Sequence, residues 1–119
     1  MPPKNNRSIS TLKSTKSCRI ALVTAPNLKT ARQLVQAALR HRLVACANII
    51  PGLESHYWWK EKLERSPEVL ILFKTTKARV LELQALVDSK HPYTTPEFVS
   101  LSVHHVSDSY LTWWMQNIR

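Results

Sequence analysis

A single glycine limits how this chain can fold. Gly52 is the only glycine among 119 residues, and it follows Pro51 at the end of a continuous apolar run, residues 43–50. Glycine accepts positive φ without steric cost, so a lone glycine beside a proline marks one special bend in a long strand. An aromatic triplet follows at residues 57–59. The pattern predicts a strand that bends once and continues as half of a long hairpin.

Periodicity supplies the other secondary-structure elements. Residues 69–73 form a second apolar run, and residues 98–103 alternate apolar residues with serines. Strands are predicted at residues 19–23, 43–50, 55–59, 63–74 and 98–103. Helices are predicted after the N-cap Asn27, over residues 77–89, and after Ser107 or Asp108. The order β-α-β-β-α-β with a terminal helix predicts an α+β, ferredoxin-like antiparallel sheet with helices on one face.

One face of this predicted sheet lacks a cover. The helices shield a single face, whereas the runs at 43–50 and 69–73 are apolar on both faces. Contiguous unshielded apolar surface is typical of a subunit interface. The sequence therefore predicts an obligate oligomer.

The net charge of +9 is concentrated near the start of the sequence. Residues 1–53 hold nine Lys or Arg and no acid, whereas residues 54–119 hold eight of each and sum to zero. Residues 1–18 are expected to form a flexible basic arm, with the start of an organelle transit peptide or a phosphate-binding arm as alternatives. Residues 19–119 are expected to form a single domain, and their charge gives no indication of nucleic-acid binding.

The two cysteines and the hydropathy point to a cytoplasmic protein. Cys18 lies in a polar stretch and Cys46 within an apolar run, so a disulfide between them is not expected and a reducing compartment is favoured. No stretch approaches the roughly 18 apolar residues that a membrane-spanning helix needs. No membrane association is predicted.

Among the five histidines, only His91 has a promising setting. The others show no metal-binding spacing, and the adjacent His104 and His105 would point to opposite faces of a strand. His91 is followed by prolines that fix the backbone beside Tyr93 and Glu97. This segment is either a preorganised site or a structural turn whose histidine and tyrosine bond to the backbone.

Several motifs together resemble the CutA family of divalent-cation-tolerance proteins. They are Thr24-Ala25-Pro26, LVACANIIPGLESHY at 43–57, Glu64, Lys74-Thr75, HPYTTPE at 91–97 and YLTW at 110–113. The resemblance runs from about residue 19 to residue 119. It implies a homotrimer whose sheets pack around a threefold axis and whose hairpins pair with neighbouring subunits. It also implies a non-enzymatic protein, linked to tolerance of divalent cations such as copper, that requires no cofactor.

The resemblance gives two candidate metal ligands. Copper-binding bacterial members have a cysteine at the end of the first strand and two adjacent histidines before Pro-Tyr. Here those positions are Val23, Lys90 and His91, so only His91 carries over. Cys46 matches a family cysteine in the second strand and is soft enough for Cu(I). Copper or another divalent cation is therefore expected to bind weakly, through His91 and Cys46.

The resemblance also implies a cleft between subunits that suits a small anionic ligand or metabolite. Its predicted lining residues are Tyr57, Trp59, Glu64, Lys74, His91, Tyr93, Glu97 and Trp113. The rival function is a trimeric signalling or scaffold protein that binds a small ligand or a partner protein there. An enzyme would use Glu64, Lys74 and His91 for acid–base work, but no nucleophile–base pair or glycine-rich phosphate loop is present.

Glu61 departs from the family pattern at the tip of the hairpin. The family usually has glycine at this position, which predicts a backbone with positive φ.

Overall fold

The structure is a computed structural model that describes residues 11–119. The elements of this part are β1 (Leu12–Ser14), β2 (Cys18–Ala25), α1 (Leu28–Arg40), β3 (Cys46–Trp59), β4 (Lys62–Thr76), α2 (Val80–Lys90), β5 (Val99–Ser102), β6 (His105–Ser107) and α3 (Asp108–Gln116). The α+β class is confirmed. The elements from β2 to β5 follow the predicted order, and α3 is the predicted terminal helix.

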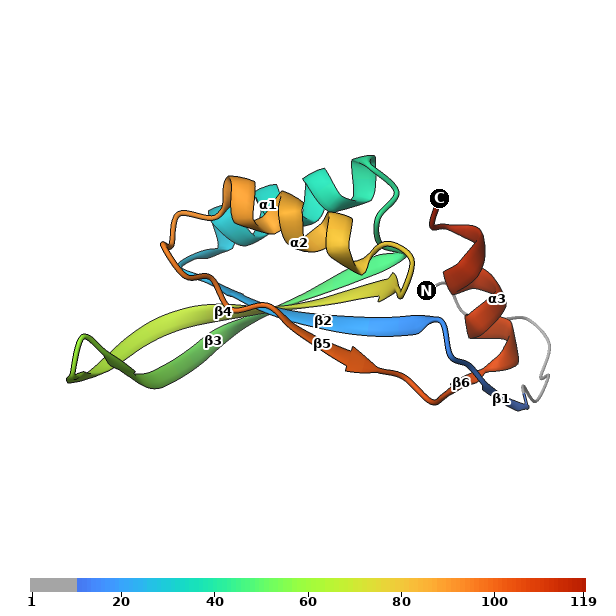
Figure 1. The fold of residues 1–119 in the computed structure, drawn as a ribbon, viewed down its shortest axis with the longest axis horizontal. Coiled ribbons are helices and arrows are strands. Elements are labelled where there is room, and N and C mark those ends of the chain that lie inside the picture. The colour runs from blue at the N-terminus through green and yellow to red at the C-terminus, as the bar shows by residue number, and fades with distance from the viewer. Residues whose placement is uncertain (1–10) are drawn as a thin grey trace.

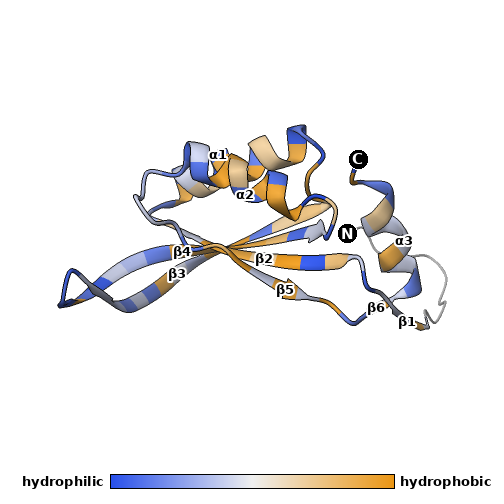
Figure 2. Cartoon of the chain, viewed as in Figure 1, coloured by the Kyte–Doolittle hydropathy of each residue, from blue (hydrophilic) through white to orange (hydrophobic). Residues whose placement is uncertain are grey.

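The main sheet has the strand order β3-β4-β2-β5, and all its pairs are antiparallel. Helices α1 and α2 lie side by side on one face of it (Figure 1). Alternate residues of the two central strands point to these helices and are fully buried there, as Val23 of β2 and Phe73 of β4 illustrate. Figure 2 shows hydrophobic residues along β2 and on the helix faces turned to the sheet. This layer is the main core.

The ends of α1 follow known capping rules. Asn27 is the predicted N-cap, and its Oδ1 accepts a hydrogen bond from the amide of Thr30 at 2.8 Å. At the other end, the amide of Leu43 donates to the carbonyl of Ala38, while Arg42 has φ of 57°. This is a Schellman ending with arginine at the position that usually holds glycine.

Strands β3 and β4 form a hairpin that projects beyond the helices (Figure 1). Gly52 has φ of 81°, and the pairing register shifts by one residue between Ile50 and Leu53. This β-bulge confirms the predicted bend. The hairpin turns at Lys60 and Glu61, whose φ values are 48° and 64°, so the predicted positive φ at Glu61 is also confirmed.

The start of the domain differs from the prediction of a flexible arm over residues 1–18. Residues 1–10 lie outside the described part. From Leu12 to Ser14 the chain pairs with β6, and Cys18 is fully buried in a second cluster with Val106 and Trp114. The apolar cover comes from α3, whose packing against this segment the sequence pattern did not show.

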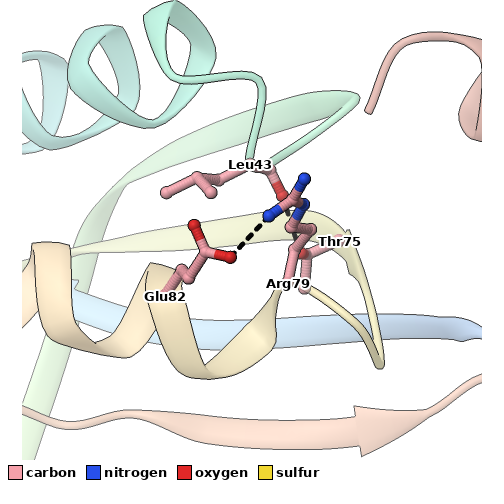
Figure 3. A network of polar contacts seen from close by, with 4 residues as sticks. All are labelled: Leu43, Thr75, Arg79 and Glu82. Carbon is pink, nitrogen blue, oxygen red and sulfur yellow. Dashed lines mark hydrogen bonds and ion pairs between the residues drawn. The ribbon is translucent and has the colours of Figure 1, made fainter. Parts of the chain in front are cut away.

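A buried threonine connects β4 to its neighbours. Thr75 donates its hydroxyl to the carbonyl of Leu43 at 2.7 Å, and its own carbonyl accepts the indole N–H of Trp114 at 3.0 Å. Close by, Arg79 and Glu82 form an ion pair at the start of α2 (Figure 3). Helix α2 begins at Val80, later than predicted, because the preceding residues form a turn. The two hydrogen bonds of Thr75 join β4 to the segment before β3 and to α3.

The sheet face opposite α1 and α2 is largely uncovered. We call it the open face, and its apolar residues are Leu22, Ile50, Leu70, Leu72, Val99 and Leu101. Within residues 11–119, helix α3 packs over one end of this face, against Ile20, and leaves the rest bare. Val99 and Leu101 are 43% and 45% exposed. The predicted lack of cover is thus present in the single chain.

Candidate functional site

A cleft of about 600 Å³ lies between the β3–β4 hairpin and the segment that joins α2 to β5. We call it the hairpin cleft. Its principal lining side chains are Tyr57, Trp59, Glu68, Tyr93 and Glu97. The strand pairing places Glu68 on the same side of β4 as Leu70 and Leu72. The cleft therefore adjoins the open face.

His91 holds the turn at residues 91–93, beside the cleft, through both of its ring nitrogens. Its Nε2–H donates to the carbonyl of Thr24 at 2.7 Å, and its Nδ1 accepts the amide N–H of Tyr93 at 3.1 Å. The ring is buried and lies 4.7 Å from that of Tyr93. This geometry matches the structural-turn alternative. A metal ion at His91 would have to displace one of the two hydrogen bonds.

Tyr93, Glu68 and Glu97 form the polar centre of the cleft. The hydroxyl of Tyr93 donates to Oε2 of Glu68 at 2.9 Å. Burial, followed by this hydrogen bond and the charge of Glu68, raises the pKa of Tyr93 to about 12. Burial and then the charge of Glu68 also raise the pKa of Glu97. The tyrosine is therefore a proton donor at neutral pH, and the two carboxylates repel each other.

Four of the eight predicted cleft residues meet in this cleft, namely Tyr57, Trp59, Tyr93 and Glu97. His91 does not line the cleft, but its hydrogen bonds hold the adjoining turn that carries Tyr93. The other three residues lie elsewhere in the single chain. Glu64 is exposed on the hairpin, opposite Tyr57.

Lys74 and Trp113 gather at the opposite end of the open face. The ammonium group of Lys74 donates to the hydroxyl of Tyr110 at 3.0 Å, and the Tyr110 ring stacks on Trp113 at 5.4 Å. This cluster belongs to α3 and the adjoining end of β4. Lys74 is remote from the hairpin cleft. In the single chain it therefore cannot supply the positive charge that the expected anionic ligand would need there.

The two predicted metal ligands do not meet either. Cys46 is half-buried and pairs in register with Lys74, which pairs in turn with Ile20 of β2. His91 bonds to Thr24, four residues further along β2, or about 13 Å at the usual strand rise. Among residues 11–119, no group of three or more His, Cys, Asp or Glu side chains is placed to hold a metal ion.

Glu68 is the cleft residue that the sequence argument missed. It directly precedes the apolar run at 69–73 and follows Pro67, within the predicted strand 63–74. The alternation of side chains along the strand contained a signal for this residue. It puts Glu68 on the same face as Leu70, beside the apolar surface that the sequence predicts to be an interface. Only the structure shows Tyr93 reaching it from 25 residues away in sequence.

Comparison with known proteins agrees with this architecture. Residues 19–117 match the family described as CutA1 divalent ion tolerance protein. This chain belongs to the CutA1 family. The resemblance found in its motifs is therefore confirmed. CutA1 is named for divalent-cation tolerance and not for a reaction, and the prediction that the chain is not an enzyme remains a prediction.

Relatives of this CutA1 chain cover most of its length. The divalent-cation tolerance protein CutA of Escherichia coli (strain K12 / DH10B) is 41% identical over 100 residues, which are 84% of this chain and 89% of that protein. CutA from Synechococcus elongatus PCC7942 is 34% identical with a TM-score of 0.88, covering 92% and 97% of the two chains. A protein from Archaeoglobus fulgidus described as periplasmic divalent cation tolerance protein CutA is 28% identical, with a TM-score of 0.83 and coverage of 86% and 99%. In this chain, none of the helices described is long and apolar enough to cross a membrane.

Proposed function

We propose that this CutA1-family chain is a non-enzymatic homotrimer that serves divalent-cation tolerance. In this proposal the ferredoxin-like sheets turn their open faces toward a threefold axis, and each hairpin contacts a neighbouring subunit. The observation that carries the proposal is the open face itself. Its six apolar residues span all four strands of the main sheet, and α3 covers only one end of it.

The hairpin gives independent support. Trp58 is 72% exposed and lies directly opposite Leu63, which is also highly exposed. An exposed cross-strand pair of large apolar side chains on a projecting hairpin is costly in an isolated chain, and it suits contact with another subunit. Aromatic residues of this kind dominate the energetics of many interfaces.

The assembly is tested by light scattering after gel filtration. Three chains of 13.7 kDa give an expected mass of about 41 kDa. Leu101→Glu places a charge on the open face and should dissociate the trimer, because an unpaired charge at an apolar interface is strongly unfavourable. Ser100→Glu is the matched control, since Ser100 is the exposed neighbour on the other side of β5. A wild-type protein that runs as a stable, folded monomer would refute the assembly.

Copper binding, where it occurs, is proposed to be weak and dependent on His91. Both nitrogens of this residue are already hydrogen-bonded, and Cys46 lies far from it along the sheet. Titration calorimetry of the reduced protein with Cu(I), Cu(II) and Zn(II) tests this. His91→Ala should abolish the weak binding, whereas His104→Ala, at an exposed histidine, should not. Sub-nanomolar affinity that survived His91→Ala would place the metal site elsewhere.

The second candidate function is that of a trimeric signalling or scaffold protein whose cleft binds a small ligand or a partner protein. The volume of about 600 Å³ supports this candidate, because it falls within the range of small-molecule sites. A structure of CutA from Synechococcus elongatus is described as complexed with Bis-Tris, an organic amine, so a relative accepts a small molecule.

A cytoplasmic location is proposed from the two free cysteines. Since one relative is described as periplasmic, cell fractionation with an antibody to this chain is the deciding measurement.

A further inference from the structure

The hairpin cleft is acidic, although the chain as a whole is basic. Glu68 and Glu97 line it together with His56, whose Nε2 lies 2.8 Å from Oε1 of Glu54, and among residues 11–119 no lysine or arginine lines it. The whole chain holds 17 Lys and Arg against 8 Asp and Glu. A hollow lined by one sign of charge concentrates ions of the opposite sign. The cleft therefore selects cations over anions.

Glu68 is a preorganised acceptor. Only 8% of this residue is exposed, and Tyr93 fixes its carboxylate through Oε2. Within the described residues, no hydrogen bond reaches its other oxygen, Oε1. In the same residues, no buried side-chain oxygen lacks a hydrogen-bond partner. Oε1 of Glu68 is therefore accessible from the cleft and lacks a donor.

Glu97 places a second negative charge near the first. Burial, and then the charge of Glu68, raises the pKa of Glu97. Two carboxylates that lose hydration and repel each other gain from a cation that contacts both. Such a cation replaces the water molecules that the carboxylates lose on burial, and its charge removes the repulsion between them.

Three aromatic side chains line the cleft beside the carboxylates, and the rest of the lining is formed by Thr24, Ser55, His56, Pro92, Thr94 and Thr95. The aromatic side chains are those of Tyr57, Trp59 and Tyr93. The hydroxyl of Tyr57 lies 2.7 Å from Oγ of Ser66, and that of Tyr93 bonds to Glu68, so both rings are fixed. Aromatic faces attract cations through their quadrupole, and aromatic cages are a recurrent means of binding ammonium groups.

We propose that the hairpin cleft binds a small organic cation, a protonated amine or a quaternary ammonium ion, with the carboxylates of Glu68 and Glu97 as its counter-charges. This deepens the small-ligand candidate above and rests on it. A hard metal ion fits the cleft less well, because such ions take six to eight oxygen ligands in a defined geometry. An ammonium ion needs only the two charges and the aromatic walls.

Choline is a suitable probe because its charge is permanent, and 3,3-dimethylbutan-1-ol is its neutral isostere. We expect calorimetric titration of the full-length wild-type protein at neutral pH to detect choline binding, with the isostere about tenfold weaker or more. Glu68→Gln and Glu97→Gln preserve shape and remove charge, and each should weaken choline binding about tenfold. Asp88→Asn removes an exposed carboxylate from α2, outside the cleft, and should change nothing.

Three results would overturn the proposal. They are equal affinity for choline and its isostere, absence of choline binding to the wild type, and binding of inorganic phosphate instead. If a glutamine variant failed to fold, as circular dichroism would reveal, the comparison of choline with its isostere on the wild type would decide alone. Light scattering on the same samples separates the two proposals. A trimer that ignores choline overturns only the ligand class, and a monomer that binds choline overturns only the assembly.

Discussion

Glu61→Gly should stabilise this protein. Glu61 has φ of 64° at the tip of the hairpin, and its neighbour Lys60 also has positive φ. The left-handed conformation costs a residue with a Cβ roughly 1–2 kcal/mol. Glycine removes that cost but loses more backbone entropy on folding, which offsets roughly 0.5–1 kcal/mol. The net gain in the free energy of unfolding is therefore about 0.5–1 kcal/mol per chain.

Thermal unfolding at one fixed protein concentration measures this gain, because the stability of an assembly depends on concentration. For a chain of this size, the melting temperature should rise by about 2–5 °C. Lys62→Gly is the matched control. Lys62 is the first residue of β4 and its φ is not positive, so glycine there should lower the free energy of unfolding by roughly 0.5–1 kcal/mol.

The two variants must therefore differ in sign. If Glu61→Gly lowered the melting temperature as Lys62→Gly does, the turn would not have positive φ in solution. The argument from backbone strain would then be refuted. The placement of the aromatic residues that this hairpin carries would also need revision.

Three further predictions concern other sites. Arg42→Gly should raise the free energy of unfolding by about 0.5–1 kcal/mol in denaturant titration, because φ of 57° at the end of α1 favours glycine; a loss would contradict the Schellman ending. Thr75→Val should lower the free energy of unfolding by about 1–3 kcal/mol, because the buried carbonyl of Leu43 loses its donor; an unchanged value would mean that water replaces the hydroxyl. Glu97→Gln should raise the melting temperature at pH 7. The raised pKa of Glu97 makes its charged form unfavourable in the folded state, so this gain should vanish as the pH falls below the unfolded value of about 4.3. A gain that is independent of pH would show that charge is not its cause.

Local rules predicted most of the main sheet. The bend at Gly52 and the cap at Asn27 each depend on the conformational preference of one residue, and the structure has both. The alternation in residues 98–103 likewise placed Val99 and Leu101 on one face of a strand. Features of this kind can be recognised from sequence because the residues that cause them are close together in the chain.

Contacts between distant segments were harder to predict. The pairing of β1 with β6 joins residues more than 90 positions apart, and the polar lead-in shows no periodicity that indicates it. The same holds for the hairpin cleft. Tyr93 was a candidate from its own motif, but its partner Glu68 lies in a strand, and neither position indicates the other. Lys74 was assigned to the cleft from the resemblance, and in the single chain it packs against α3.

The one-residue bulge at Gly52 decides which side chains of the outer hairpin face the cleft. Strand alternation has a period of two, so the extra residue places Tyr57 and Trp59 toward the cleft and Trp58 on the reverse side. Regular pairing of the full sequence without the bulge would set Trp58 opposite Lys62 in place of Trp59, and it would exchange the two sides over the whole outer strand. Deleting Gly52 together with the bulge would instead leave Tyr57 six residues after Ile50, on the side where it lies now. The hairpin should therefore tolerate the loss of this residue better than a substitution that abolishes the bulge and keeps the length.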